Sequence, residues 1–464
     1  MQTLALYLYV LSAVLFILSL KWMSDVKMSR YGNLAGVLGM AVAIGTTLMA
    51  YQTQNYSLLL GALVVGTLIG APIAMKLPMT AVPQRTAMSH AFGSFAVALI
   101  GMAEYYQRLP NAAEALGPFT TGVLAVEIVL GFLTFMGSVI AFLKLQEMIS
   151  GRPLVYPGRN FVSVGVFVAC LGLAVALVLN PTNSTLVPII VVFALIFGFL
   201  LVMGIGGADM PTVIAILNAY AGLSAAALGF VLNNKLLIVA GTLDGSSGLI
   251  LAFIMCKSMN RSFLNVLFGG VGSVVSAPSA KGGSGEERIV HAFSPEDLAI
   301  VLGTAQRVVI APGYGMAVAQ AQHVVKELEE ALTERGCETL YAIHPVAGRM
   351  PGHMNVLLAE ADVSYDKLIE LEEINPLLAE TDVAIVLGAN DVVNPAARNA
   401  KDSPIYGMPI LEVDRAHTIV VIKRSMASGF AGVDNDLFYN PKTMMVFGDA
   451  KKVLSETVKK MEAT

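Results

Sequence analysis

The sequence RVVIAPGYGMAVAQAQ, from Arg307 to Gln322, contains the succession of elements that decides the fold of the C-terminal part of the chain. A β-branched run at Val308–Ile310 leads into the glycine turn Gly313–Gly315, and small residues that suit a helix follow. Glycines let a phosphate approach the backbone closely, and the free N–H groups of a helix start attract anions. The stretch therefore predicts a dinucleotide pyrophosphate site or, equally well, an ordinary tight turn between strand and helix.

Strand and helix patterns alternate through the rest of the C-terminal part. Such alternation predicts an α/β Rossmann-like domain with a doubly wound parallel sheet. The predicted helices are Ser294–Leu302, Met316–Arg335, Pro351–Ala361, Tyr365–Glu373 and Ala450–Met461. The predicted strands are Val308–Ile310, Thr339–Ile343, Val383–Gly388, Ile410–Val413, Ile419–Lys423 and Met444–Phe447.

The composition of the preceding part indicates a multi-span α-helical membrane domain. The whole chain of 464 residues is 56% hydrophobic and 13% charged, whereas soluble domains carry about 25% charged residues. A bilayer is crossed by about 20 apolar residues, and nine segments approach that length. They are Leu4–Leu20, Tyr31–Ala50, Leu58–Met75, Thr86–Tyr106, Thr121–Leu145, Phe161–Leu179, Leu186–Gly204, Pro211–Leu232 and Leu236–Met259.

The distribution of cations orients these segments. With the N-terminus outside, the outer connections carry only Arg108 and Lys235. The inner ones carry Lys21, Lys27, Arg30, Lys76, Arg85, Lys144, Arg152, Arg159, Lys257 and Arg261. Positive charge accumulates on the cytoplasmic side, so we expect the C-terminal domain in the cytoplasm. The first segment lacks a basic start and a cleavage site, which favours an anchor over a signal peptide.

We therefore expect three parts: a transmembrane domain at 1–261, a glycine- and serine-containing linker at 262–290 and a soluble domain at 291–464. The net charge of -4 gives no indication of nucleic-acid binding. Cys170, Cys256 and Cys337 have no metal-ligand or disulfide-framework spacing, so we expect no metal.

Residues that follow the predicted strands are the candidate nucleotide ligands, because ligands bind beyond the carboxyl ends of parallel strands. The second strand ends at His344 and Arg349 rather than at the carboxylate expected of an NAD site. The run Lys423-Arg424-Ser425 offers two cations and a hydroxyl, which suit a 2′-phosphate. These residues favour NADP over NAD, although a pair of surface cations would look the same.

Two further segments have both a functional and a plain interpretation. Asn390-Asp391 follows a strand and is either turn chemistry or a hydrogen-bonding group for a nicotinamide or ribose. The glycine-rich stretch from Gly429 to Gly432 is either a mobile flap over a nucleotide or a simple loop.

Ionisable residues inside apolar spans are functional candidates. His90 suits proton relay because its ordinary pKa lies near neutrality, while Glu127 is a weaker candidate that could be interfacial. Asn218 either holds water or joins helices by hydrogen bonding. Asp209 lies at a predicted cytoplasmic turn and is otherwise a helix N-cap, and Asp244 precedes small residues that permit close helix packing.

Seven runs in order resemble the beta subunit of the proton-translocating nicotinamide nucleotide transhydrogenases. In the membrane part and its end they are GGADMP at Gly206–Pro211, GSSG at Gly245–Gly248 and MCKSMNRSF at Met255–Phe263. In the soluble part they are PGYGMAVAQAQ at Pro312–Gln322, IHPVAGRMPGHMNVLLAEA at Ile343–Ala361, GANDVVNPAA at Gly388–Ala397 and KRSM at Lys423–Met426. The resemblance is looser before Gly206.

The resemblance implies a Re/Si-specific enzyme that passes hydride from NADH to NADP⁺ while protons move inward across a bacterial inner membrane. It implies NADP(H) on this chain, NAD(H) on a partner alpha subunit, and a dimer of alpha–beta units in membrane lipid. His90 and Asn218 match the proton path, Asp209 a cytoplasmic junction, and Asp391 a residue of coupling. The implied nucleotide-binding residues are Gly313, Tyr314, Gly315, Met316, Ala317, Val318, Arg349, Gly388, Asn390, Asp391, Lys423, Arg424, Ser425, Gly429, Ala431 and Gly432.

Two other functions are compatible with a membrane chain that carries a nucleotide-binding domain. A transporter or channel with a nucleotide-sensing domain would show paired, broken helices in two halves of the chain, and no such symmetry is visible. A dehydrogenase that reduces quinone would need a flavin, haem or iron–sulfur centre, which three scattered cysteines do not supply as a cluster.

Overall fold

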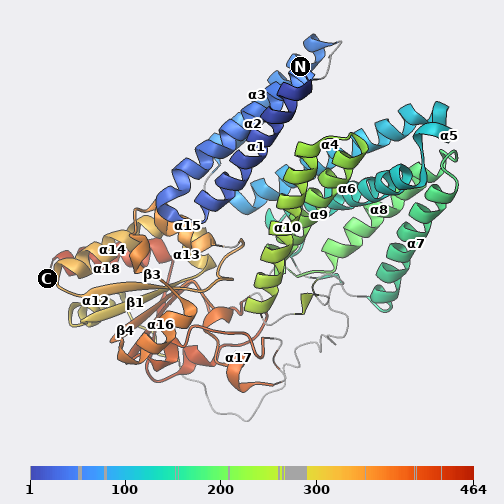
Figure 1. The fold of residues 1–464 in the computed structure, drawn as a ribbon. Helices are drawn as coiled ribbons and strands as arrows, with labels where there is room; N and C mark the ends of the chain where they lie inside the picture. Colours follow the sequence, from blue (N-terminus) through green and yellow to red (C-terminus); the bar gives the residue numbers. More distant parts are fainter. Residues whose placement is uncertain are drawn as a thin grey trace. The chain divides into compact units, whose positions relative to one another are not determined.

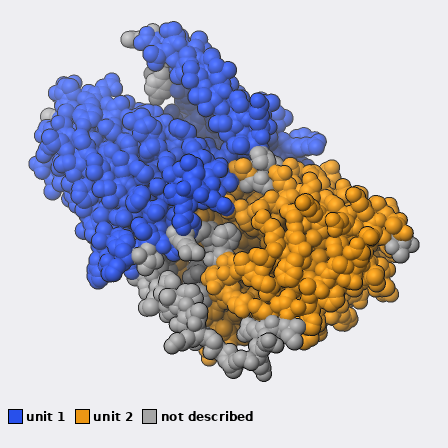
Figure 2. Space-filling model, turned by 180° about the vertical axis from the view of Figure 1, so that it is seen from behind, with its two compact units in different colours: residues 1–77, 84–205, 213–252 blue, residues 78–83, 206–212, 253–464 orange. Residues whose placement is uncertain are grey.

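The computed structural model describes residues 2–50, 55–77, 81–151, 153–154, 156–206, 209–259, 262–263, 266, 290–350, 352–401, 403, 405–429 and 431–463. The predicted linker at 262–290 therefore lies almost wholly outside the described residues, as does Pro351 at the start of a predicted helix. The chain forms two compact units (Figure 2). Unit 1 comprises residues 1–77, 84–205 and 213–252, and unit 2 comprises residues 78–83, 206–212 and 253–464.

Within the described residues, nine helices are long and apolar enough to cross a membrane, which confirms the sequence prediction. The helix named α5 is a single short turn at Ala112–Ala115. The nine long helices (Figure 1) are α1 (Gln2–Met23), α2 (Ser29–Ala50), α3 (Tyr56–Lys76), α4 (Val82–Arg108), α6 (Pro118–Leu145), α7 (Arg159–Leu179), α8 (Leu186–Met203), α9 (Met210–Val231) and α10 (Lys235–Ser258).

Helices α9 and α10 pack with their backbones in contact because both carry glycines where they meet. A Cβ atom on Gly222 would lie 2.2 Å from the backbone nitrogen of Gly245, and one on Gly241 would lie 2.5 Å from that of Ala226. Small residues at such positions are typical of membrane helix pairs, where close packing drives association. The glycines around Gly245 are thus explained by helix packing, and that packing fixes Asn218 and Asp244 relative to each other.

The C-terminal end of α8 is held by two cations of unit 1. The Lys144 ammonium is buried and donates to the carbonyl oxygens of Val202, Met203 and Ile205 at 3.1, 3.2 and 2.8 Å. The Arg159 guanidinium donates to the Gly204 carbonyl at 3.1 Å. The last carbonyls of a helix lack intrahelical partners and carry partial negative charge, so cations stabilise them.

We expect Lys144→Met to destabilise the membrane unit by about 3 kcal/mol, because it leaves buried carbonyls without a donor. The melting temperature of the purified chain in detergent would measure this loss. Lys21→Met is the matched control, since Lys21 is exposed in the last turn of α1. Equal melting temperatures for the two variants would show that the three bonds of Lys144 contribute nothing net.

Unit 2 contains a six-stranded parallel sheet in the order β3-β2-β1-β4-β5-β6, which confirms the predicted doubly wound fold. Alternate residues of β1 face opposite layers: Val308 and Ile310 join one core and Val309 and Ala311 the other. The strands are β1 (Arg307–Pro312), β2 (Glu338–Ile343), β3 (Leu368–Glu370), β4 (Val383–Leu387), β5 (Thr418–Lys423) and β6 (Thr443–Phe447).

Helices cover both faces of this sheet. One layer contains α12 (Pro295–Gly303), α13 (Tyr314–Ala319), α14 (Gln322–Glu334), α15 (His353–Glu360) and α18 (Ala450–Glu462). The other contains α16 (Leu371–Leu377) and a series of single 3₁₀ turns. The short helix α17 (Ala396–Asn399) packs in a separate small cluster with Ile405 and Ile410.

Three predicted elements are wrong. The helix predicted over Met316–Arg335 is two helices, α13 and α14, because Gln320 adopts a left-handed conformation with φ 48° between them. The helix predicted over Tyr365–Glu373 contains strand β3, which pairs with β2. The strand predicted over Ile410–Val413 is a loop followed by a 3₁₀ turn at Val413–Arg415, and its apolar residues fill cores rather than pair with a strand.

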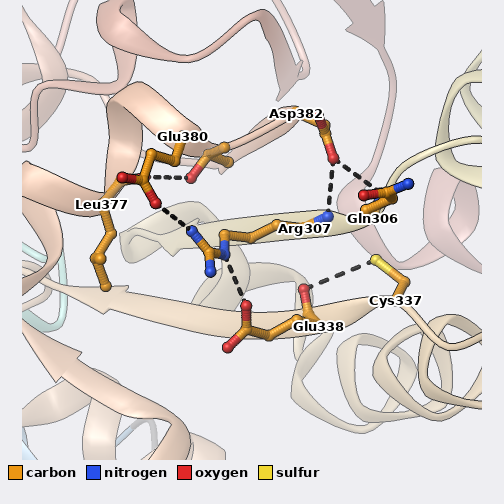
Figure 3. A network of polar contacts seen from close by, with 8 residues as sticks. Gln306, Arg307, Cys337, Glu338, Leu377, Glu380 and Asp382 are labelled. Carbon is orange, nitrogen blue, oxygen red and sulfur yellow. Dashed lines mark hydrogen bonds and ion pairs between the residues drawn. The ribbon is translucent and has the colours of Figure 1, made fainter.

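A cluster of charged groups at the amino ends of β1, β2 and β4 is structural (Figure 3). The Arg307 guanidinium contacts Glu338 at 2.6 Å and Glu380 at 3.1 Å, and both carboxylates are exposed. The Asp382 carboxylate accepts from the backbone N–H groups of Gln306 and Arg307 at 2.8 and 2.9 Å. These backbone donors hold the pKa of Asp382 below its ordinary value. The cluster joins the three strands at their amino ends, which is the end of the sheet opposite to the carboxyl ends of the strands.

Candidate functional site

The sheet of unit 2 has a topological switch point between β1 and β4. The chain leaves β1 for α13 and α14 on one face and returns to β4 from α16 on the other. A crevice opens beyond the carboxyl ends of two such strands, and ligands of this fold bind there. The turn after β1, the turn after β4 and the end of β5 all lie at this edge.

The two glycine turns at the switch point are packed against each other. The backbone N–H of Gly313 donates to Leu387 and that of Gly315 to Gly388, each at 2.9 Å. A Cβ atom on Gly313 would lie 2.5 Å from Cα of Ala389, and one on Gly315 would lie 2.6 Å from Cα of Gly388. The glycines are therefore required by the contact between the turns, which is the plain interpretation of the motif.

The side chains that follow the glycine turn are divided between core and surface. Met316 and Ala317 are buried in the core of the α14 layer, so only their backbone can face the edge. Val318 is 46% exposed. Helix α13 ends after six residues, and this shortness limits the dipole that its N-terminus can present.

Arg349 is positioned by the aromatic ring of the glycine turn and by the start of α15. Its guanidinium lies over the Tyr314 ring, 4.3 Å from the ring centroid, and its backbone N–H donates to Nδ1 of His353 at 3.0 Å. His353 is almost fully buried, and burial followed by the nearby Arg349 charge lowers its pKa to about 4. Neutral His353 thus fixes the loop that carries a cation to the switch-point edge.

His344, which follows β2, is a structural residue in this fold. Its ring is buried, and both ring nitrogens have partners. Nε2 lies 2.8 Å from the Pro409 carbonyl oxygen, and Nδ1 accepts from the Val346 N–H at 3.2 Å. Burial lowers the pKa of His344 to about 4. One ring nitrogen donates and the other accepts, so the neutral form satisfies both groups.

These two histidines make the stability of unit 2 dependent on pH. Their folded pKa values of about 4 lie below the ordinary value of 6.5. Between these limits the unfolded chain binds protons that the folded chain excludes, so the free energy of unfolding falls as the pH is lowered. The slope is up to about 1.4 kcal/mol per pH unit for each histidine. Urea unfolding of the purified chain at several pH values would measure it.

The double variant His344→Gln, His353→Gln is expected to be less stable at neutral pH but to have a flatter pH dependence. His323 is exposed on α14, so His323→Gln is the control and should keep the slope of the parent chain. A double variant with an unchanged slope would show that other groups titrate in this window.

Asn390 and Asp391 are covered by the loop that contains Gly429–Gly432. The Ala431 N–H donates to Oδ2 of Asp391 at 3.0 Å, and a Cβ atom on Gly429 would lie 2.6 Å from Oδ1 of Asp391. The Asn435 side-chain amide donates to the backbone and side-chain oxygens of Asn390 at 3.1 and 3.0 Å. The flap segment and the strand-end pair, which are far apart in sequence, thus form one hydrogen-bonded unit.

The three residues after β5 have different surroundings. The Lys423 ammonium donates to the Ala427 carbonyl at 2.5 Å and lies over the Phe438 ring, 4.5 Å from its centroid. Burial lowers the pKa of Lys423, while Asp391 and Asp434 act in the opposite direction. Arg424 and Ser425 have exposed side chains. Lys423 therefore shapes the loop, and the side chains of Arg424 and Ser425 face solvent.

A second polar group lies in unit 1, where α4, α9 and α10 meet, and its Asp244 is exposed. His90 is half-buried on α4, hydrogen-bonds with Asn218 of α9 and is within electrostatic range of Asp244 of α10. The Asn218 amide also donates to the side-chain and backbone oxygens of Asp244 at 3.1 and 3.3 Å. A histidine, an amide and a carboxylate thus meet on three different apolar helices.

Asp209 is not part of this group. It belongs to unit 2 and directly precedes the start of α9, and its backbone N–H donates to the Gly206 carbonyl at 3.1 Å.

Comparison with known proteins decides the family. The model of the NAD(P) transhydrogenase beta subunit family matches residues 5–460. The chain belongs to this family. It is 47% identical over 463 residues to the NAD(P) transhydrogenase subunit beta of Rhodospirillum rubrum, covering 99% of both chains. The same protein from Rhodospirillum rubrum strain ATCC 11170 matches to the same extent.

For this transhydrogenase family member, the structure gathers the predicted residues into two groups. The predicted nucleotide residues lie at the switch-point edge of unit 2, and His90 and Asn218 lie together in unit 1. Sequence reasoning did not find the roles of His353 and Asn435. His353 lies four residues after Arg349, the spacing of one helical turn, which could have indicated contact. Asn435 follows the flap in a run of polar residues that carries no specific signal.

Proposed function

We propose that this chain is the NADP(H)-binding and membrane subunit of a proton-translocating transhydrogenase. Hydride passes from NADH, held by a partner alpha subunit, to NADP⁺ held at the switch-point edge of residues 291–464. Proton movement inward through residues 1–261 is coupled to this transfer. The observation that carries the nucleotide part is the meeting of three strand ends at one end of the sheet, with buried Arg349 and exposed Arg424 both following strands of this sheet.

The residues at the edge fit a dinucleotide with a 2′-phosphate. Arg349 is held by stacking and suits a pyrophosphate, while exposed Arg424 and Ser425 suit the extra phosphate through charge-assisted hydrogen bonds. The nicotinamide ring, when bound, supplies the carbon that accepts hydride. The chain itself orients the nucleotide and excludes water, which is sufficient for direct transfer between two rings.

Coupling requires a connection between the nucleotide edge and the membrane part. The bond between Ala431 and Asp391 links the flap to the strand end, so a change at the nucleotide can alter both together. We propose that this change reaches the cytoplasmic face near Asp209 and controls the access of His90. We further propose that the protein lies in a bacterial inner membrane with its C-terminal domain in the cytoplasm and works as a dimer of alpha–beta units.

Calorimetry on the full chain in detergent tests the nucleotide assignment. We expect NADPH to bind tightly and NADH weakly. Arg424→Ala should weaken NADPH binding by about tenfold to a hundredfold, the loss of one or two charged hydrogen bonds. Its effect on NADH should be small because NADH has no 2′-phosphate.

Lys459→Ala is the matched control, since Lys459 is exposed in the last turn of α18, away from the strand ends. It should bind NADPH as the parent chain does. Equal affinity for NADPH and NADH would reject the 2′-phosphate site and favour a transporter with a nucleotide-sensing domain.

A further inference from the structure

Glu127 is a carboxylic acid of unit 1 whose side chain makes no hydrogen bond with any described residue. It lies on α6 with 0% of its surface exposed, and neither carboxyl oxygen has a hydrogen-bond partner among the described residues. Its backbone carbonyl accepts from the Ser224 hydroxyl of α9 at 3.1 Å, but this bond leaves the carboxyl unaffected. A Cβ atom on Gly101 would lie 1.5 Å from Oε2, so α4 makes room for the acid with a glycine.

Polar side chains near the C-terminal end of α4 bond with groups other than Glu127. Arg108 pairs with Glu104 at 3.0 Å, and the Tyr105 hydroxyl donates to the Pro181 carbonyl at 2.9 Å. Within the described residues, no cation lies within ion-pair distance of Glu127. The ionisable residues of its own helix and of the helices packed against it are Arg85, His90, Glu104, Tyr105, Tyr106, Arg108, Lys144, Arg159, Cys170 and Tyr220.

An acid in such surroundings is neutral. An isolated carboxylate in an apolar medium costs on the order of tens of kcal/mol, so the group keeps its proton instead. Because Glu127 makes no side-chain bond, its retention in the core is not explained by stability. Ionisable groups inside a membrane bundle are costly and are found where protons or ions move.

The buried face of α4 connects this acid with His90. Gly101 follows His90 by eleven residues, which is close to three helical turns and about 16 Å along the axis, so both lie on one face. Ser94 lies on the same face one turn after His90 and is 2% exposed. Its hydroxyl and Nδ1 of His90 both have hydrogen-bonding capacity that no described protein group uses. Three polar groups, each with hydrogen-bonding capacity that no described residue uses, therefore follow one another along the buried face of α4.

We propose that Glu127 is a second proton-binding site of the membrane unit, in series with His90. The O–H bond of the acid breaks as its proton passes toward His90, and the carboxylate regains a proton from the opposite direction. The carboxyl group thus loses one proton and regains one, and no other bond is made or broken at Glu127. This role rests on the proposed function, whereas the protonated state of Glu127 does not.

Infrared difference spectroscopy of the alpha–beta complex in liposomes tests the protonated state. At neutral pH the parent complex should show the carbonyl band of a protonated carboxylic acid, and Glu127→Gln should lose it. Glu104→Gln is the control and should keep the band, because Glu104 is paired with Arg108. Absence of the band in the parent complex would overturn the proposal, since the acid would then be ionised at rest.

Proton uptake by the same liposomes, driven by NADPH and NAD⁺ added outside, tests the role, because the reverse reaction moves protons away from the side that binds the nucleotides. We expect Glu127→Gln to reduce uptake by about a hundredfold, the scale of removing one acid–base group, with NADPH binding retained. Glu127→Asp keeps an acid and should recover part of the rate. Full uptake in Glu127→Gln would overturn the role. If the parent complex moved no protons although its Glu127 band were present, the proposed function would fail and the shuttle role with it, while the site itself would stand.

Discussion

Gly388→Ala is expected to unfold the switch-point edge and to abolish nucleotide binding. Gly388 has φ +65°, and a Cβ atom there would lie 2.4 Å from Cα of Gly315 and 2.7 Å from its carbonyl carbon. A left-handed conformation costs a non-glycine residue about 1–2 kcal/mol, and overpacking costs about 1–3 kcal/mol more. The total of about 2–5 kcal/mol is a large part of the stability of an ordinary domain. Urea unfolding and NADPH calorimetry on the full chain would measure both effects.

Gly336→Ala separates the two causes. Gly336 has φ +79°, so alanine there carries the same conformational cost, but beyond its chain neighbours no atom of the described residues lies within 4 Å of its Cβ position. This control should lose about 1–2 kcal/mol and bind NADPH normally. If the two variants were equally stable, the contact between the β1 and β4 turns would be looser than the structure has it.

This contact shows where a sequence pattern predicts a position but not its reason. The Gly-x-Gly pattern correctly located the end of strand β1 and the start of the helix after it. It did not reveal that the partner of Gly313 and Gly315 is the turn after β4, because residues 75 positions apart leave no mark of contact in a single sequence. Glycine is therefore required at these positions by the close approach of protein backbone, whether or not a phosphate also binds there.

The wrongly predicted elements have similar causes. The break at Gln320 depends on a left-handed residue that is not glycine, and no glycine or proline announces it. Strand β3 has three residues and is specified by its pairing with Tyr341–Ile343 rather than by its own pattern. Ile410 and Leu411 are apolar and therefore resemble a strand, yet they serve two different cores. Tertiary contacts decided each of these cases.

The membrane-spanning helices were easier to predict than the contacts between the polar side chains that they carry. Each span is long, apolar and bounded by polar residues, so its presence follows from the sequence alone. Which polar side chains meet depends on helix rotation and packing. The group of His90 with Asn218 and Asp244 depends on the close approach of α9 and α10 at Gly222 and Gly245, and spacing in the sequence does not contain that information.

His90→Asn is expected to abolish proton-coupled turnover, with a loss of about a thousandfold in proton uptake by liposomes that contain the alpha–beta complex. Asparagine preserves a hydrogen-bonding group toward Asn218 but cannot bind and release a proton near neutral pH. NADPH binding should persist, because the nucleotide edge belongs to the other compact unit. The pH dependence of turnover should also change, since the titrating group has been removed.

His323→Asn is the matched control, because His323 is exposed on α14 of unit 2. It should pump at the rate of the parent complex. A His90→Asn complex that kept both the rate and the pH profile would show that protons pass without the histidine.

The variant Asp244→Asn adds a further distinction. If Asp244 only positions Asn218 and His90, this variant should keep the pH profile of turnover while lowering its rate. If it carries the proton itself, the profile should change as it does for His90→Asn.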